Sequence, residues 1–350
     1  MAYTNIDDPS AHFQALTYTG NGTTTNNVTN TGNSNLQPDW IWIKQRNATE
    51  DHVVTDTSRD GEVDSGTNIV LAPNTNEAEA TSTGFGINPA TNGINFDASW
   101  HKVNENNSTF VAWQWKANGG TTSTNNDGNH TSVVQANQDA GFSIVTYTGT
   151  GNTSSTVGHG LGVTPNWIIF KRRSGTGNWD VQIDGTSRVT LNLTEPFATN
   201  VLSSFSSTTF GLGSVTSNEK NANGSTYLAY CFASKQGYSK FGQYVGNGNA
   251  DGTFVYTGFK PAFVLTKRTD TTGNWLMHDN KRIGHNPNNY ELYANLTNVE
   301  EDNDRMDILS NGFKMRLNNA DSNASGGTYI FMAFAENPFV TSTGIPTTAR

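Results

Sequence analysis

Short hydrophobic segments alternate with polar turn segments along the whole chain. The hydrophobic segments are rich in Val, Ile, Thr, Phe, Tyr and Trp, and clusters of Gly, Asn, Pro and Asp bound them. This pattern is typical of β-strands joined by turns. Apolar residues at helical spacing over a dozen residues are missing, and the nearest candidate, residues 289–300, is interrupted by Asn and Thr. We therefore predict an all-β protein.

The strand pattern occurs three times, in the same order. A strand with a glycine turn reads TYTGNG at 17–22, TYTGTG at 146–151 and QYVGNG at 243–248. A proline-initiated strand reads PDWIWIKQR at 38–46, PNWIIFKRR at 165–173 and PAFVLTKRT at 261–269. An aromatic strand reads NSTFVAWQWKA at 107–117, GSTYLAYCFAS at 224–234 and GGTYIFMAFAE at 326–336. This ordered recurrence indicates an internal triplication.

The triplication predicts three tandem β-sandwich domains of the jelly-roll type. A span of roughly 100 residues with several short strands is typical of a sandwich. A closed barrel is the alternative. The expected boundaries are an N-terminal attachment segment 1–10, repeats 11–117, 141–240 and 241–339, a linker or long loop 118–140, and a C-terminal tail 340–350. The segment 118–140 is assigned as a linker because Gly, Asn, Thr and Ser dominate it.

The faces of two strands can be predicted from their side chains. Successive apolar residues in WIWIK, WIIFK and FVLTK indicate a central strand that is covered on both faces. In the aromatic strand, Val111, Trp113 and Trp115 should point to one face, and Phe110, Ala112 and Gln114 to the other. Cys231 falls at the position of Gln114 and is expected to be a small strand residue rather than a nucleophile.

Composition narrows the range of functions. The net charge is −9, the pI is about 5.2, and the 21 Lys and Arg residues are scattered, so we expect no nucleic-acid binding. The single cysteine excludes an intrachain disulfide. The first residues lack the basic and apolar regions of a signal peptide, and no apolar run is long enough for membrane insertion. These features suit synthesis in a reducing cytoplasm.

Basic and aromatic residues recur at matching places in the repeats. Basic residues end the second strand, and an Asp–Arg pair follows the next strand at Asp56/Arg59, Asp184/Arg188 and Asp279/Arg282. One interpretation is a set of salt bridges inside each domain that holds strand register; the other is a polar edge that contacts a sugar or a partner. The candidate contact residues are Arg46, Arg59, Arg173, Trp179, Arg188, Arg268, Trp275 and Arg282.

The chain carries no motif that predicts catalysis. A nucleophile elbow and a phosphate loop are absent from the sequence. A glycosidase would need two placed carboxylates, whereas the one acidic cluster, residues 300–304, is expected to be a solvated loop. The histidines do not pair at metal-ligand spacing. We expect neither an enzyme nor a cofactor or metal site.

The repeat strings resemble a known domain. The YTGNG turn at 18–22, the P-x-W-x-x-x-K-R strand at 165–172 and the closing TYIFMAFAENPF at 328–339 look like a repeat domain of virion proteins of marine tailed bacteriophages, such as those of cyanobacteria and pelagic bacteria. The resemblance covers 11–339 and is weakest in the first repeat, where TFVAWQWKA departs from the pattern. It implies a β-rich structural component of the virion and no active site.

We therefore expect a tail fibre or tail-associated adhesion protein that binds a host surface glycan. It would assemble with other virion proteins as a homo-oligomer, with a trimer favoured because oligomers bury further apolar surface. A capsid decoration or head-fibre protein is the first alternative. A glycan depolymerase and a cellular carbohydrate-binding module are alternatives from other classes.

Overall fold

The computed structural model describes residues 3–59, 68–199, 202–213, 219–282 and 286–347. Over these residues the chain is almost entirely β, as the hydrophobic pattern predicts. The helical elements are a single 3₁₀ turn, η1 (Pro9–Ala11), and a short α-helix, α1 (His101–Asn104). Within the same residues, neither element is long and apolar enough to cross a membrane.

The strands follow the three repeats along the chain. The first repeat contains β1 (Phe13–Thr19), β2 (Asn26–Thr29), β3 (Trp40–Gln45), β4 (Val53–Asp56), β5 (Asn68–Val70), β6 (Ala80–Ser82), β7 (Ile87–Ala90), β8 (Gly93–Phe96) and β9 (Thr109–Trp115). The second contains β10 (Ser123–Asn125), β11 (Ser132–Asn137), β12 (Phe142–Thr148), β13 (Thr156–Gly158), β14 (Trp167–Arg172), β15 (Asp180–Gln182), β16 (Ser187–Thr190), β17 (Ala198–Thr199), β18 (Thr209–Gly211) and β19 (Thr226–Phe232). The third contains β20 (Ser239–Val245), β21 (Phe254–Tyr256), β22 (Phe259–Arg268), β23 (Trp275–Asp279), β24 (Asn288–Tyr293), β25 (Glu301–Leu309), β26 (Gly312–Met315) and β27 (Thr328–Pro338).

Each repeat builds the same antiparallel inner sheet. Its strand order is β1-β9-β3-β4 in the first repeat, β12-β19-β14-β15 in the second and β20-β27-β22-β23 in the third. The proline-initiated strand therefore lies between two neighbours in every repeat, which explains why both of its faces are apolar. The aromatic strand lies at its side in each sheet.

A second layer covers one face of each inner sheet. In the first repeat this layer is β2-β8-β7, and in the second it is the pair β13-β18. In the third repeat the sheet continues from β23 through β24, β25 and β26 to β21. This eight-stranded sheet curls until β21 returns beside β20, where the Thr253 hydroxyl donates to the Val245 carbonyl at 2.8 Å. The third repeat is therefore close to a barrel with one open seam.

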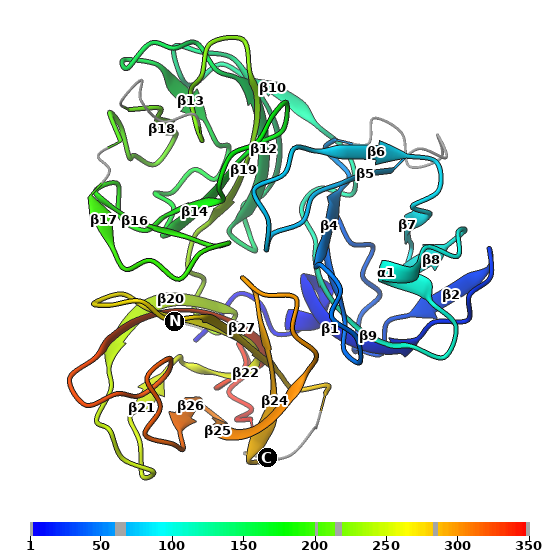
Figure 1. Ribbon diagram of the computed structural model, residues 1–350. Helices are drawn as coiled ribbons and strands as arrows, with labels where there is room; N and C mark the ends of the chain where they lie inside the picture. The colour runs from blue at the N-terminus through cyan, green and yellow to red at the C-terminus, as the bar shows by residue number, and fades with distance from the viewer. Residues whose placement is uncertain (1–2, 60–67, 200–201, 214–218, 283–285, 348–350) are drawn as a thin grey trace.

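The three inner sheets meet in the middle of the molecule (Figure 1). One hydrophobic cluster contains residues of all three repeats, and we call it the shared core. Its members include Trp40, Trp42, Trp113, Trp115, Trp167, Trp179, Tyr230, Phe232, Phe263, Trp275, Met332 and Phe334. Rings touch across each boundary: Trp40 and Tyr230 lie 4.5 Å apart between centroids, Phe13 and Phe334 5.2 Å, and Trp167 and Trp275 6.1 Å.

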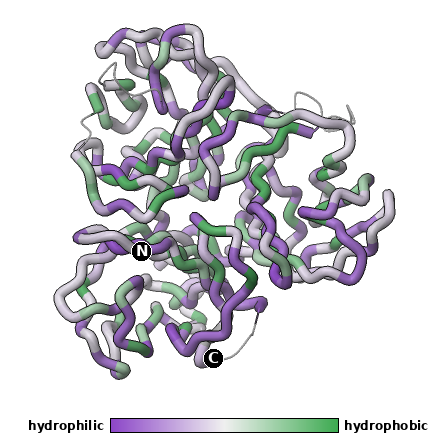
Figure 2. The backbone as a smooth tube through the Cα atoms, viewed as in Figure 1, coloured by the Kyte–Doolittle hydropathy of each residue, from purple (hydrophilic) through white to green (hydrophobic). Residues whose placement is uncertain are grey.

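Strand periodicity divides the apolar residues between two cores. Trp40 and Trp42 face the shared core, whereas Ile41 and Ile43 face the first repeat's own core. In β9, Val111, Trp113 and Trp115 join the shared core, and Phe110 and Ala112 join the inner one, as predicted. Figure 2 shows the result: hydrophobic stretches follow the inner strands, and the outer loops are mostly hydrophilic.

Residues 118–140 are not a linker, contrary to the prediction from their composition. They contain β10 and β11, and β11 pairs antiparallel with β12 from Val133↔Thr146 to Asn137↔Phe142. The second repeat's sheet thereby gains two strands at its edge. Few large apolar residues are needed there because β10 is an edge strand with one neighbour, and β11, between β10 and β12, packs mainly one face, here with Val134 and Ala136.

The described parts of the two terminal segments pack on their own chain, whereas we expected attachment peptides. Ile6 is buried in the shared core, and the Thr4 hydroxyl donates to the Gln236 carbonyl at 2.7 Å. At the other end, the Ser342 amide donates to the Asp7 carboxylate at 2.6 Å. The N-terminal segment therefore packs on the shared core and the second repeat, and the C-terminal segment contacts the N-terminal one. Residues 1–2 and 348–350 lie outside the described residues.

Candidate functional site

Two of the candidate arginines form ion pairs between repeats. Arg46 of the first repeat contacts Glu300 of the third through both Nε and Nη2, with the shortest distance 2.7 Å. Arg173 of the second repeat contacts Glu79 of the first through the same two nitrogens, at 2.7 and 3.0 Å. In each pair, two guanidinium nitrogens bind the same carboxylate, a geometry that the planar guanidinium group favours. Arg46 and Arg173 thus serve the boundaries between repeats.

A buried Asp–Arg pair lies behind each of these ion pairs. Asp56 and Arg59 are 2.6 Å apart, and Asp279 and Arg282 are 2.7 Å apart, with all four side chains fully buried. The same arginines also reach the boundary glutamates: Arg59 lies 3.1 Å from Glu79, and Arg282 lies 3.3 Å from Glu300.

Each buried aspartate also accepts a hydrogen bond from the neighbouring repeat. The Tyr230 hydroxyl donates to Asp56 at 2.7 Å, and Trp113 Nε1 donates to Asp279 at 3.0 Å. Tyr230 and Trp113 hold matching positions on β19 and β9. The predicted Asp–Arg salt bridges therefore exist within the first and third repeats, where they also join those repeats to their neighbours.

The second repeat lacks this network, which corrects the prediction of a third Asp184/Arg188 pair. Asp184 is exposed and accepts from the backbone amides of Thr186 and Ser187. Half-buried Arg188 contacts the Thr190 hydroxyl at 3.4 Å. The position that faces Trp167 across the strands, as Asp56 faces Trp40, falls on Ile183, one residue before Asp184.

Apolar residues replace the charges at this third boundary. Ile183 packs against the shared core, and Met332 stands where Trp113 and Tyr230 stand in the other repeats. The backbone amides of Glu79, Phe197 and Glu300 donate to the carbonyls of Arg173, Thr269 and Arg46, respectively. These three bonds form a cycle around the molecule, so Phe197 and Thr269 hold the places of a boundary glutamate and its arginine.

The two candidate tryptophans are buried and cannot stack on a ligand. Trp179 is 1% exposed and Trp275 is 0% exposed. Trp179 Nε1 donates to the Ala72 carbonyl of the first repeat at 3.1 Å, and Trp275 Nε1 donates to the Thr190 carbonyl of the second at 3.0 Å. His52 does the same in the first repeat, with Nε2 lying 3.0 Å from the Tyr293 carbonyl of the third.

The remaining candidate, Arg268, pairs locally. Its guanidinium contacts Asp270 at 2.9 Å and donates to the Ala320 carbonyl at 3.1 Å. Beside it, Lys267 is buried and donates to the carbonyls of Arg268 and Thr194. Lys44 and Lys171 are buried in the same way, and burial lowers the pKa of each of these three lysines to about 8.

The buried carboxylate of Glu291 lies close to the half-buried carboxylate of Glu301 in the third repeat. The acidic run 300–304 is not a solvated loop, because most of it belongs to β25. The Tyr293 hydroxyl lies 2.6 Å from Glu291 and 2.7 Å from Glu301, and burial raises the pKa of Glu291. Glu291 is 0% exposed and lies 2.6 Å from Arg305, so a polysaccharide chain has no access to it.

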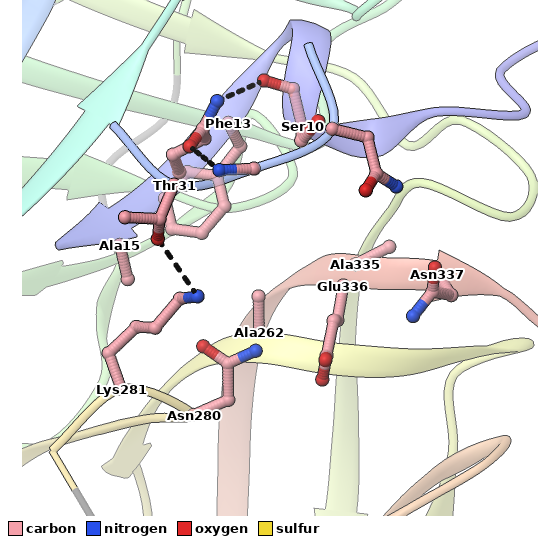
Figure 3. Close-up of a pocket in the computed structure, with 13 residues that line it drawn as sticks. Ser10, Phe13, Ala15, Thr31, Ala262, Asn280, Lys281, Ala335, Glu336 and Asn337 are labelled. Carbon is pink, nitrogen blue, oxygen red and sulfur yellow. Dashed lines mark hydrogen bonds between the residues drawn. The ribbon is translucent and has the colours of Figure 1, made fainter. Parts of the chain in front are cut away.

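A cavity of about 320 Å³ lies between the first and third repeats (Figure 3). Phe13, Ala15, Ala262 and Ala335 give it apolar walls. The polar groups around it include the side chains of Ser10, Thr31, Asn280, Lys281, Glu336 and Asn337. A small cavity with apolar walls and several amide, hydroxyl and charged groups has the chemistry of a ligand site.

Asn280 is the most informative residue of this cavity. The residue is 5% exposed, and its side-chain carbonyl oxygen has no hydrogen-bond partner among the residues that the structure describes. A buried carbonyl without a partner costs free energy, so a hydroxyl or amide donor from a ligand would stabilise it. Lys281 beside it reaches the Thr31 hydroxyl at 3.5 Å, which is a weak contact that a ligand could replace.

The chain matches a known protein family across all three repeats. A domain of unknown function, DUF7483, matches residues 8–338. The chain belongs to the DUF7483 family. The match spans all three repeats and the residues on both sides of the cavity. No curated protein and no solved structure matches the chain.

The sequence pattern pointed to residues that the structure of this DUF7483 chain places at the boundaries between repeats, although we expected salt bridges inside each domain or contacts with a sugar or partner. The repeated strings point to Arg46, Arg173 and the Asp–Arg pairs because these residues recur. The cavity was missed. Asn280 and Lys281 stand where the first repeat has Thr57 and Ser58, between a matching Asp and Arg, and the meaning of these two departures depends on the contact between distant repeats.

Proposed function

We propose that this DUF7483 chain is a non-enzymatic structural protein of a bacteriophage particle that binds a glycan, as a tail fibre or tail-associated adhesion protein. The resemblance of its repeat strings to virion proteins of marine tailed phages supports the particle. The cavity between the first and third repeats supports the binding of a small polar ligand.

One observation carries the structural part of this proposal. The charged and aromatic residues that recur among the repeats make contacts inside the chain: Arg46 and Arg173 bind glutamates, and Trp179 and Trp275 donate to backbone carbonyls. Triplication has therefore preserved the residues that hold the repeats together. A repeated scaffold of this kind suits a rigid component made without disulfides.

The cavity favours a neutral, polyhydroxylated ligand of about one sugar ring. Its lysine and glutamate carry opposite charges, and Glu336 lies 3.4 Å from Lys260, so the lining has no strong preference for an ion. Alanines and Phe13 present CH groups and one ring, and the amides of Asn280 and Asn337 can bind hydroxyls. Hydroxyl groups are suitable donors for the unpartnered Asn280 oxygen.

The position in the particle tests the structural part. Purified virions should contain the protein, and labelled antibody should mark the tail in electron micrographs. Label on the capsid shell would replace the tail assignment with the decoration or head-fibre alternative. Virions without the protein would contradict the proposal as a whole.

Glycan binding tests the ligand part. The full chain should bind neutral glycans on an array of host surface polysaccharides without releasing reducing ends. The Asn280→Ala variant should weaken this binding at least about tenfold because it removes a buried hydrogen-bonding group. Asn223→Ala, an exposed asparagine of the second repeat, is the matched control and should bind normally. Equal binding by both variants, or no binding by the wild type, would refute the cavity as the glycan site.

A further inference from the structure

The open seam of the third repeat presents an unpaired strand edge. β20 pairs with β27 on one side, and its other side ends the sheet. A groove runs along this edge between β20 and β21 and is lined by Lys240, Gly242, Gln243, Phe254 and Tyr256, among others. An exposed strand edge of this kind is a template for pairing with another strand.

The second repeat shows what fills the corresponding seam. There β11 pairs antiparallel with β12, the strand that matches β20. The Ser132 hydroxyl at the start of β11 also donates to the Gly158 carbonyl of β13 at 2.8 Å, which ties β11 to the outer layer. The same chain thus contains one seam closed by a strand, whereas β20, like β1 in the first repeat, ends its sheet without an added strand among the described residues.

The backbone groups along β20 define how long an added strand can be. Even-numbered residues bond to β27, as the contact from the Ala335 amide to the Tyr238 carbonyl shows. Odd-numbered residues point into the seam. At one end the Phe241 amide donates to the Ser234 hydroxyl, and at the other the Val245 carbonyl accepts from Thr253.

The groups between these two ends have no partner in the described chain. They are the Phe241 carbonyl, both backbone groups of Gln243 and the Val245 amide. These donors and acceptors match those of a second copy of β20 that is related to the first by a twofold axis through Gln243. Gln243 would exchange two hydrogen bonds with its own copy, and each Phe241 carbonyl would accept from the other chain's Val245 amide.

We propose that β20 is a homodimer interface, at which two copies of the chain pair their β20 strands antiparallel across Gln243. The surrounding surface fits this partner. Phe254 and Tyr256, which line the groove, are 45% and 47% exposed, and Val245 at the end of β20 is 56% exposed, which is unusual for large apolar residues. Lys240 is held over the Tyr256 ring, at 5.2 Å from its centre, and donates to the Tyr256 carbonyl. The pairing would therefore bury apolar side chains beside the new backbone bonds.

Sedimentation equilibrium of the full chain tests this proposal. The wild type should show a reversible monomer–dimer equilibrium. Gln243→Pro removes the central amide from both copies, and we expect the dimer dissociation constant to rise at least about tenfold. Gln243→Thr keeps the amide and is the matched control, which should dimerise like the wild type. A wild type that stays monomeric, or a dimer that Gln243→Pro leaves unchanged, would overturn the proposal.

Hydrogen exchange gives a second measurement on the unmodified protein. The Gln243 and Val245 amides should exchange more slowly as the protein concentration rises, because they become bonded only in the dimer. The Phe241 amide is bonded to Ser234 in both states and serves as the internal control. Exchange at Gln243 and Val245 that does not depend on concentration would also contradict the pairing, even if the proline variant does not fold.

Discussion

Each buried aspartate at a repeat boundary is held by several partners at once. Asp279 contacts Arg282 and Trp113, and it accepts from the backbone amides of Lys281 and Arg282 at 2.9 and 3.1 Å. These bonds compensate for the loss of water around the buried carboxylate. The cost of removing the aspartate should therefore come mainly from the arginine left behind.

We predict that Asp279→Ala destabilises the protein by about 3–5 kcal/mol, since it removes the charge partner at 2.7 Å from buried Arg282, whose other carboxylate contact, Glu300, is longer at 3.3 Å, and leaves Trp113 Nε1 without an acceptor. Urea unfolding measures this free energy. Asp184→Ala changes the corresponding turn of the second repeat, where the carboxylate is exposed, and should cost less than about 1 kcal/mol.

The second repeat suggests a further control for this prediction. Ile183 and Met332 show that an apolar boundary is compatible with the fold. The double variant Asp279→Leu with Arg282→Met removes both charges, so it should be less destabilised than Asp279→Ala alone. A double variant less stable than the single one would contradict our explanation of the buried pair.

At the scale of elements, the inner strands could be predicted and the edge strands could not. Two-sided burial of β3 follows from its continuous apolar residues, and the faces of β9 follow from strand alternation. In contrast, β11 offers few apolar residues, and its role depends on where the β12 edge lies. The Asp184/Arg188 prediction failed because Arg188 follows Asp184 by four positions, whereas the arginine of each other pair follows its aspartate by three. The turn at Gly185 resembles the other two turns, but its aspartate has a different strand register.

The residues of the candidate site could also be predicted only in part from the sequence. Recurrence points to the boundary arginines, but their partners Glu79 and Glu300 are remote in sequence from Arg173 and Arg46. Nothing in a single repeat indicates that its aromatic strand faces another copy. The cavity requires residues near 13 and 31 to meet residues near 262, 280 and 335, which no local pattern specifies.

Gln135 provides a direct test of β11, the strand that the composition of residues 118–140 did not predict. Its side chain accepts from the amides of Asn118 and Gly120 and donates to the hydroxyls of Thr57 and Ser58 of the first repeat. We predict that Gln135→Ala costs about 2–3 kcal/mol in urea unfolding, because it removes a buried side chain that bonds four groups at once, among them the buried Thr57 hydroxyl. Gln138→Ala at an exposed position should be nearly neutral, and equal stabilities would show that β11 does not fasten the two repeats.

At the scale of the whole molecule, three repeats form one threefold-like unit within a single chain (Figure 1). Two boundaries are polar and one is apolar, and all three are joined by the same cyclic backbone bonds. This threefold-like arrangement lies inside one chain, and the homotrimer of whole chains stays a separate prediction. Pairing through β20 would then join two complete chains, each with three repeats.

Differential scanning calorimetry of the full chain tests the shared core most directly. Because residues of all three repeats pack in one cluster, no repeat can unfold without exposing the apolar faces of the others. We predict a single reversible transition whose calorimetric enthalpy equals the van't Hoff enthalpy. Two or three resolved transitions, with a calorimetric enthalpy well above the van't Hoff value, would mean that the repeats are independent domains and would contradict this account.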